Sequence, residues 1–462
     1  MEPMTVRELL AATDGKLLGD VSLDTTISGV ETDSRAVHDG DLFVAIRGEN
    51  IDGHQFITGA LEGGALGCLT AVPPKEAVPG KFYVLVEDTV QALGQVARAY
   101  KARFPIPVIG ITGSVGKTTT KEMMACALQG TFRTAKSEGN HNNDLGLPMS
   151  IMALEEDVEV AVLEMGMNHF GEMAYLTSVA QPDIAVITNI GTMHIEHLGS
   201  REGILRAKLE ILQGVPRGGV GVFNGDEPLL WNVRSDGGLK KFYYGIENTA
   251  CDVIAEDIEE LEDGMRFRVR GMRKSFEVYI PAAGRHMVYN ALAVITTALL
   301  LEVKPEALQR QLGQFHNTGM RQKIYEYNGV TIIEDCYNAG PESMQAALNV
   351  LENYRAKGRR IAVLGDMLEL GNRSSAEHYR IGRLVAQKAD MLFVYGEHSV
   401  RTVTGAITGG MNPKNTEHFD THEDLARMLK MRVSEGDVVL IKGSRGMKME
   451  RVLELFLKDE KK

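Results

Sequence analysis

Apolar residues along this chain follow two patterns that alternate almost from end to end. One is a short continuous apolar run bounded by turn residues, as at 108–112 and 438–442, which is typical of a buried strand. The other places apolar residues three and four positions apart, as over 89–104, which is typical of an amphipathic helix. Strands that alternate with helix-length segments predict an α/β fold with parallel sheets and right-handed crossovers.

These patterns divide the 462 residues into three regions. A chain of this length is too long for one hydrophobic core. The first region mixes short strands with Gly-rich turns, the second begins with the helix over 89–104, and the strand–helix rhythm starts again after Phe315. We therefore predict a small N-terminal α/β domain over 1–86, a central parallel-sheet domain over 87–316 and a C-terminal doubly wound, Rossmann-like domain over 317–462.

The predicted strands are short and mostly apolar. In the C-terminal domain Gly365 and Gly443 each follow one of them, but neither glycine opens a GxGxxG segment, so the sequence does not predict a dinucleotide site there. The strands are predicted over 41–46 and 81–86, then 108–112, 158–164, 184–189 and 220–224, and finally 330–335, 360–364, 391–395 and 438–442.

A glycine-containing loop, GITGSVGKTTT over 110–120, lies between a predicted strand and a predicted helix. In that context the backbone N–H groups turn toward phosphate oxygens, Lys117 reaches the terminal phosphates and Thr118 can hold Mg²⁺. The loop is shorter than GxxxxGK[ST], which would need glycine at Ile111, so the alternative is a simple turn with a surface lysine. We predict a central ATP-binding domain whose phosphate loop comprises Gly113, Ser114, Val115, Gly116, Lys117, Thr118 and Thr119.

Polar residues end the strands that neighbour this loop in sequence. Glu164 ends one strand, Thr188 and Asn189 end another with His194 just beyond, and Asn224 ends a third. Ligands of open α/β sheets bind beyond the carboxyl ends of the strands. Single residues of this kind are more often ordinary core or surface positions, but three polar ends beside a phosphate loop favour a metal-nucleotide site.

Lys208 lies in a helix predicted over 200–213 and shares a face with Ile204, Ile211 and Leu212. From spacing alone we favour a lysine whose stem packs on apolar neighbours while its ammonium reaches water. The alternative is a desolvated lysine that belongs to the metal-nucleotide site.

Composition limits the classes of function. The net charge of −12 argues against a nucleic-acid partner, which needs a broad basic surface. The four cysteines form no CxxC pair, which argues against a disulfide framework or a zinc site. The first residues do not resemble a secretion signal, and no apolar run approaches the roughly 18 residues of a membrane span. We expect a cytoplasmic protein.

The motifs together resemble the Mur ligase family. Four segments resemble its central ATPase domain: GITGSVGKTTTKEM (110–123), EGNHNNDLGLP (138–148), EMGM (164–167) and TNIGTMHIEHLGS (188–200). Three resemble its UDP-sugar domain: DSR (33–35), GDLFVA (40–45) and DGH (52–54). Three more resemble the C-terminal domain of the member that adds D-alanyl-D-alanine: YNA (337–339), GDMLELG (365–371) and KGSR (442–445).

The resemblance implies a ligase that uses ATP and Mg²⁺. ATP would phosphorylate the free carboxylate of UDP-muramoyl-tripeptide, and the amine of D-alanyl-D-alanine would then displace phosphate to form an amide. Activation of a carboxylate in this way needs positioning and charge neutralisation rather than a nucleophilic side chain. We expect the enzyme to act as a monomer.

The resemblance also implies roles for single residues. It makes Lys208 a carbamylated metal ligand, which reverses the preference from spacing, and it assigns catalysis to Lys117, Lys208 and His194. Gly340 departs from the asparagine that the family usually has there. The implied metal ligands are Thr118, Glu164, His194 and Lys208, the further nucleotide contacts Asn290, Arg321 and Asp335, and the UDP-sugar contacts Ser34, Arg35, Asp52, Gly53 and His54.

Three other functions compete with this interpretation. Two belong to related ligases, the Mur ligase that adds the third residue and the folylpolyglutamate synthases, and the segment 365–371 favours the D-alanyl-D-alanine enzyme over both. The third is a regulatory GTPase switch. It would need a guanine-reading NKxD motif after a strand, and neither TNIG (188–191) nor NGDE (224–227) supplies one.

Overall fold

The computed structural model describes residues 1–48, 50–235, 238–317 and 319–458, so the predicted end of the third domain, 459–462, lies outside the described residues. The chain separates into two compact units, and each contains part of the predicted central domain. The first unit comprises 1–112, 131–186 and 209–221, and the second comprises 113–130, 187–208 and the chain from 222 onward.

The first unit begins with a five-stranded sheet in the order β2-β7-β6-β5-β4, in which only the β2–β7 pair is antiparallel. Phe43, Cys68 and Tyr83 on these strands pack against Ile57 and Leu61 of helix α2, which forms a small core. The elements are β1 (Met4–Thr5), α1 (Val6–Thr13), β2 (Lys16–Leu18), β3 (Thr26–Ile27), β4 (Gly29–Glu31), β5 (Asp41–Val44), α2 (Ile57–Glu62), β6 (Gly67–Thr70) and β7 (Phe82–Leu85).

The first unit continues with parallel strands, where β10 pairs with β8 on one side and with β9 on the other. Asp88 caps helix α3 by accepting the N–H groups of Val90 and Gln91. The predicted strand at 108–112 is confirmed, and the one at 158–164 starts two residues later than expected. The elements are α3 (Thr89–Lys101), β8 (Val108–Thr112), β9 (Thr134–Lys136), α5 (Gly146–Met152), β10 (Val160–Glu164), α6 (Glu172–Ala180), β11 (Ile184–Ile187) and, after a return from the second unit, η2 (Glu210–Gly214) and β12 (Val220–Asn224).

The second unit contains an antiparallel meander, β14-β15-β16, which the expectation of a purely parallel central sheet missed. Along β15 buried apolar residues alternate with exposed arginines, and this period of two was a readable signal. The elements of this part are α4 (Lys117–Leu128), α7 (Ile195–Leu198), α8 (Arg201–Leu209), α9 (Pro228–Asn232), β13 (Lys240–Gly245), β14 (Val253–Glu260), β15 (Met265–Gly271), β16 (Lys274–Ile280), α10 (Arg285–Leu300) and α11 (Pro305–Leu312).

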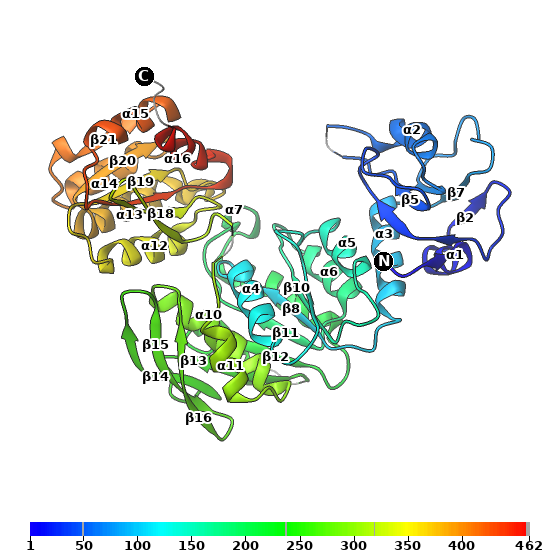
Figure 1. The fold of residues 1–462 in the computed structure, drawn as a ribbon, viewed down its shortest axis with the longest axis horizontal. Coiled ribbons are helices and arrows are strands. Elements are labelled where there is room, and N and C mark those ends of the chain that lie inside the picture. Colours follow the sequence, from blue (N-terminus) through cyan, green and yellow to red (C-terminus); the bar gives the residue numbers. More distant parts are fainter. Residues whose placement is uncertain (49, 236–237, 318, 459–462) are drawn as a thin grey trace. The chain divides into compact units, whose positions relative to one another are not determined.

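The C-terminal part of the second unit is a six-stranded sheet in the order β17-β18-β22-β19-β20-β21, parallel except for the β17–β18 pair. Ile333 and Leu440 face one core with α12, α13 and α14, while their neighbours Ile332 and Val439 face another with α15 and α16 (Figure 1). Helices on both faces confirm the doubly wound prediction.

The strands predicted in this part are confirmed within one residue at each end. Strands β20 and β22 are nearly continuous apolar runs and are buried, as expected for a parallel sheet covered on both faces. The elements are β17 (Lys323–Tyr327), β18 (Val330–Asp335), α12 (Pro341–Asn353), β19 (Arg360–Gly365), α13 (Ser374–Lys388), β20 (Met391–Tyr395), α14 (Val400–Thr408), β21 (Thr416–Phe419), α15 (His422–Arg432), β22 (Val438–Lys442) and α16 (Glu450–Leu457).

None of the helices in the described part of the chain has the length and apolar character needed to cross a bilayer.

Candidate active site

The phosphate loop turns directly after β8 and ends where α4 begins at Lys117. Gly113 and Gly116 have φ angles of 155° and 83°, which side chains other than glycine rarely adopt. A Cβ on Gly113 would lie 1.9 Å from Thr188 Oγ1, and one on Gly116 would lie 2.7 Å from Asn290 Oδ1. The loop therefore needs glycine at both positions, and Asn290 of α10, a predicted nucleotide contact, lies against it.

Residues after β11 hold the loop in this conformation. The Ser114 N–H donates to the Asn189 carbonyl oxygen at 3.2 Å, and the Val115 N–H donates to Asn189 Oδ1 at 3.0 Å. Thr188 Oγ1 and Asn189 Nδ2 both donate to the Val115 carbonyl oxygen, at 2.7 and 3.1 Å. These strand-end residues, predicted as part of a metal-nucleotide site, thus shape the phosphate loop through direct hydrogen bonds.

Two lysines lie beside the loop in the second unit. Lys117 Nζ donates to the Gly113 carbonyl oxygen at 3.0 Å, which folds the side chain back over the loop. Lys208 is only 2% exposed, which is incompatible with an ammonium that reaches water, so the interpretation favoured by spacing was wrong. Burial lowers the pKa of Lys208 well below its ordinary value, and the positive charge of Lys117 lowers it further. Both effects favour the neutral form of its amine.

The helix that carries Lys208 is also shorter than predicted. α8 ends at Leu209, and the chain continues as the 3₁₀ segment η2, so Ile211 and Leu212 do not extend the α-helical face of Lys208. The shared stripe assumed from spacing requires 3.6 residues per turn throughout. The burial of Lys208 consequently does not follow from that stripe.

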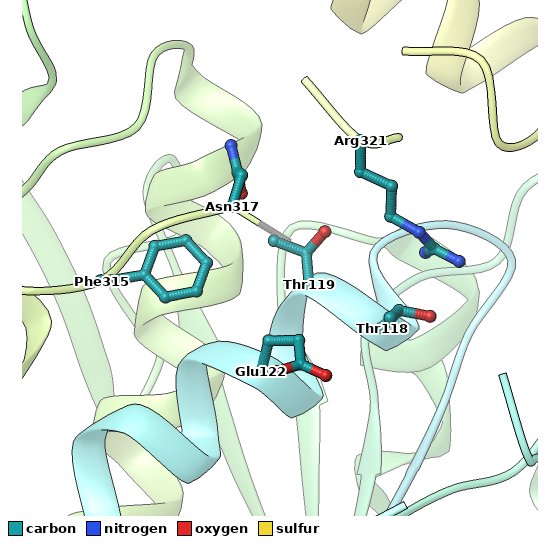
Figure 2. Close-up of a pocket in the computed structure, with 6 residues that line it drawn as sticks. All are labelled: Thr118, Thr119, Glu122, Phe315, Asn317 and Arg321. Atoms are coloured by element: carbon teal, nitrogen blue, oxygen red, sulfur yellow. The ribbon is translucent and has the colours of Figure 1, made fainter. Parts of the chain in front are cut away.

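A small pocket opens beside the first turn of α4. It is lined by Thr118, Thr119, Glu122, Phe315, Asn317 and Arg321. Figure 2 shows the Arg321 side chain extending toward Thr118 from one side, with Phe315 on the opposite side. The Arg321 guanidinium carbon lies 3.9 Å from the centroid of the Tyr337 ring, a cation–π geometry that fixes its plane. The first turn of α4 after the phosphate loop and Arg321 therefore line one pocket.

His194 lies in a segment that contacts the C-terminal part of the same unit. It has a φ of 62° and lies at the start of α7. Its Nδ1 lies 2.7 Å from Glu369 Oε2, and Thr192 Oγ1 donates to Glu342 Oε1 at 3.0 Å. The sequence interpretation gave Glu342 and Glu369 no role, although Glu369 lies within the segment 365–371 that resembles the family.

Arg201 fixes the same segment from the other side. Its Nη2 donates to the Ile190 carbonyl oxygen and to Glu227 Oε1, both at 2.7 Å. Burial raises the pKa of Glu227 and the charge of Arg201 opposes that rise. Arg201 and Glu227 were missed because an arginine at the start of a helix carries no sequence signal of a distant carbonyl partner.

Glu164, the predicted metal ligand of the first unit, is the last residue of β10 and is 1% exposed. Asn142 Nδ2 donates to its Oε1 at 2.8 Å, and the Glu164 N–H donates to Ser137 Oγ at 3.1 Å. Asn142 therefore orients this carboxylate, and Ser137 holds the backbone of the same residue. Asn142 lies in the segment 138–148, so the motif was noticed but the side chain's partner was not.

The predicted UDP-sugar residues lie in the first unit. Arg35 Nε and Nη2 donate to the two Asp33 carboxylate oxygens at 2.9 and 2.7 Å, and this pairing lowers the pKa of Asp33 to about 2. Ser34 is half-buried between them. The Arg35 side chain is exposed.

Asp52, Gly53 and His54 stabilise the loop in which they lie. His54 Nδ1 lies 2.6 Å from Asp52 Oδ1, while His54 Nε2 accepts the Ala71 N–H at 3.0 Å. A Cβ on Gly53 would lie 2.6 Å from the Ile46 carbonyl oxygen. Both His54 nitrogens are therefore used, one by Asp52 and one by the backbone after β6, so this residue joins the two segments.

Asp335, the predicted nucleotide contact of the C-terminal sheet, is paired with a lysine. Lys442 Nζ donates to Asp335 Oδ2 at 2.6 Å. Gly340 has Met193 in the place that a side chain would take, since a Cβ there would lie 2.9 Å from Met193 Cγ. The departure from asparagine at this position is thus matched by a methionine in the segment of His194.

Family models match three successive regions of the chain. The model described as Mur ligase family, catalytic domain, matches 26–101; the Mur ligase middle domain matches 111–298; and the Mur ligase, glutamate ligase domain, matches 320–445. These matches follow the chain in the order of the N-terminal, central and C-terminal regions.

Two relatives carry the name UDP-N-acetylmuramoyl-tripeptide--D-alanyl-D-alanine ligase. The one from Bacillus subtilis is 39% identical over 97% of this chain and 97% of its own length, and the one from Escherichia coli is 34% identical over 98% of each. Among solved structures, MurF from Acinetobacter baumannii has a TM-score of 0.91 at 32% identity and covers 99% of this chain and 100% of that chain. MurF from Thermotoga maritima in complex with ADP has a TM-score of 0.83 at 31% identity and covers 93% and 96%.

Proposed function

Because this chain belongs to the Mur ligase family of ATP-dependent ligases, we propose that it joins D-alanyl-D-alanine to UDP-N-acetylmuramoyl-tripeptide in peptidoglycan precursor synthesis. The chain has the three-domain α/β fold of that family. The observation that carries the proposal is full-length similarity to ligases of that name, together with a phosphate loop whose glycines, Lys117 and neighbouring buried Lys208 suit phosphoryl transfer.

The reaction begins with transfer of a phosphoryl group from ATP to the tripeptide carboxylate. Lys117 and the N-terminal N–H groups of α4 neutralise charge on the phosphates, and Arg321 contacts the nucleotide from the pocket beside them. The amine of D-alanyl-D-alanine then attacks the acyl carbon, and the acyl–oxygen bond to phosphate breaks. Phosphate leaves with one oxygen that came from the tripeptide.

We propose Mg²⁺ as the cofactor that neutralises phosphate charge when bound. The described residues contain no group of three or more His, Cys, Asp or Glu side chains arranged for a metal ion. Mg²⁺ usually takes one or two carboxylates and completes its shell with phosphate and water, so an oriented carboxylate such as Glu164 and the Thr118 hydroxyl suit it. His194 is proposed to complete the protein ligands.

Lys208 is proposed to act as a carbamate. Carbon dioxide reacts only with a neutral amine, and the burial of Lys208 favours that form by lowering the pKa of the side chain. The N–C bond forms as a proton leaves, and the product is an anion with two oxygens. Such an anion beside Lys117 would add oxygen ligands and would be stabilised by the lysine's positive charge.

The remaining assignments complete the proposal. The enzyme is cytoplasmic and monomeric, with domains over 1–86, 87–316 and 317–462. Asn290, Arg321 and Asp335 contact ATP together with the phosphate loop. The UDP-sugar is bound in the first domain by Ser34, Arg35, Asp52, Gly53 and His54, where Arg35 supplies charge and the loop of His54 supplies shape.

A ligation assay with isotope labelling tests this function. Purified protein should release phosphate from ATP only when UDP-N-acetylmuramoyl-tripeptide and D-alanyl-D-alanine are both present, and oxygen-18 from the tripeptide carboxylate should appear in that phosphate. A parallel assay with a UDP-muramoyl-dipeptide and either lysine or diaminopimelate tests for the activity of the Mur ligase that adds the third residue. Ligation of those amino acids, or label found only in the amide, would contradict the proposal.

A further inference from the structure

The carboxyl ends of β18 and β22 are joined by a buried lysine. Lys442 is the last residue of β22, is 2% exposed and pairs in register with Asp335, the last residue of β18. Its Nζ donates to Asp335 Oδ2 at 2.6 Å and to the Asn338 carbonyl oxygen at 2.9 Å. One ammonium therefore fixes a carboxylate and the backbone three residues further along.

The buried ion pair of Lys442 and Asp335 is not explained by its effect on the free energy of unfolding. Burying an ammonium and a carboxylate removes both from water, and exchange of such a pair for apolar residues is often neutral or stabilising. The preceding residues of β22, Val438 to Ile441, are all apolar and buried, which is what the sheet requires. The pair at the strand ends is therefore better explained by the orientation that it imposes.

The segment held by Lys442 adjoins the proposed nucleotide contacts. Tyr337 lies between Asp335 and Asn338, and its ring stacks on the guanidinium of Arg321, which lines the pocket beside the phosphate loop (Figure 2). Ser444, two residues after Lys442, donates from Oγ to the Ala339 carbonyl oxygen at 2.9 Å. The end of β22 thus holds this segment at two points.

Asp335 also faces helix α10. Burial lowers the pKa of His286 in the first turn of that helix, the negative charge of Asp335 opposes this effect, and the positive charge of Lys442 adds to it. The same helix carries Asn290 next to Gly116 of the phosphate loop. Asp335 and Lys442 therefore lie where the C-terminal sheet meets a helix of the nucleotide site.

We propose that Lys442 is a positioning residue for the nucleotide: its ammonium holds the Asp335 carboxylate, and the backbone that carries Tyr337, in the orientation in which Asp335 and Arg321 contact ATP. The inference rests on the proposed nucleotide roles of Asp335 and Arg321. It makes Lys442 act through these two residues, without touching the nucleotide.

Calorimetric titration of the full chain with ADP tests the proposal. Lys442→Met should raise the Kd for ADP about tenfold or more, since it leaves a carboxylate without its charged donor. Lys442→Arg, which keeps the charge, should give an intermediate Kd. Lys388→Met is the matched control, because Lys388 pairs with Glu352 in the same sheet domain, far along the sequence from these contacts, and it should leave the Kd unchanged.

A double-mutant cycle separates positioning from general destabilisation. If Lys442 acts through Asp335, the effects of Lys442→Met and Asp335→Asn on the Kd should not add, whereas independent roles give additive effects. If Lys442→Met does not fold, Lys442→Arg replaces it in the cycle. Thermal unfolding of every variant reports stability separately from the Kd.

Two results would overturn the inference: a parental Kd in Lys442→Met, or strictly additive effects in the cycle. ADP binding requires neither peptide substrate, so this test is independent of ligation. A protein that binds ADP with the expected dependence on Lys442 but does not join D-alanyl-D-alanine would contradict the proposed reaction and support the role of Lys442.

Discussion

The phosphate loop and the carboxyl ends of the C-terminal sheet both place glycine and lysine directly after a parallel strand, but they use these residues differently. In the loop, Gly113 and Gly116 have positive φ angles and bend the backbone around an open turn. In the C-terminal sheet, Gly365 and Gly443 have ordinary backbone angles and instead make room for Met449, whose Sδ would lie 2.9 Å from a Cβ on Gly365. One set of glycines shapes a binding surface and the other admits a side chain.

The lysines differ in the same way. Lys117 folds over the loop onto a backbone carbonyl, whereas Lys442 is neutralised by a carboxylate at 2.6 Å. Met449 is fully buried over the ends of β19 and β22, where a doubly wound sheet often has its ligand crevice. A doubly wound fold therefore does not imply a nucleotide site of its own, because a side chain from the segment that follows a strand can fill the crevice.

Among the variants considered, Lys117→Ala should lower the rate of ligation most. A small effect would show that the loop lysine and the lysine of the C-terminal sheet do not differ in role. The substitution removes the cation that faces the transferred phosphate, so ligation should fall by about 10³-fold or more. The loop conformation depends on glycines and Asn189, so thermal unfolding should change little. Near-normal turnover would show that this loop is not the phosphate site.

Lys208→Ala should lower ligation by about 10²-fold, since it removes a proposed oxygen ligand at the metal. A small carboxylate such as acetate should restore part of the activity by taking the place of the carbamate. Lys442→Ala is the control at a buried lysine that already has a carboxylate partner, and acetate should not rescue it. A Lys208→Ala variant as active as the parent would exclude the carbamate.

The sequence predicted the elements and the phosphate loop better than it predicted the partners of the polar residues at the strand ends. The order of strands and helices, the doubly wound sheet and the phosphate loop followed from local patterns, because buried strands and glycine turns are written in neighbouring residues. The partners of Glu164, His194 and Asp335 did not, because Asn142, Glu369 and Lys442 are distant in sequence and only the tertiary fold brings them together.

Lys208 shows the limit of periodicity most clearly. Its spacing favoured a solvent-reaching lysine, yet the side chain is buried and the helix ends one residue later. A stripe on a helix indicates which side is apolar, but it does not indicate what covers that side. The resemblance to a family reversed the preference from spacing, and the carbamate that it implies stays a prediction.

A matched pair of Gly→Ala substitutions should separate the two kinds of glycine. Gly116→Ala introduces a side chain at a φ of 83° and 2.7 Å from Asn290 Oδ1, so the Kd for ADP should rise by about tenfold or more. Gly365→Ala should leave that Kd unchanged but lower the free energy of unfolding by about 1–3 kcal/mol, through overpacking against Met449. Equal effects of the two variants on ADP binding would contradict the distinction.

The smallest expected effect is a pH dependence of stability that arises from the C-terminal sheet. His378 of α13 is 1% exposed; its Nε2 accepts the Met367 N–H at 3.0 Å and its Nδ1 donates to the Ser374 carbonyl oxygen at 2.8 Å. The ring is therefore neutral, and its 3.8 Å approach to Asp366 is not an ion pair. This histidine fixes the backbone of the segment 365–371 at Met367.

Burial lowers the pKa of His378 below its ordinary value, against the raising effects of the Ser374 carbonyl and the Asp366 and Glu377 charges, while His398 lowers it further. Since the folded pKa lies below the unfolded value of about 6.5, the unfolded chain binds the proton first as pH falls. The contribution of the neutral His378 to the free energy of unfolding is thus present above that pH and is lost below it. Thermal unfolding from pH 7.5 to 5.5 should show a falling midpoint that is shallower in His378→Gln, whereas a variant at exposed His38 should keep the parental slope. Parallel curves for the parent and His378→Gln would show that this histidine does not couple protons to the fold.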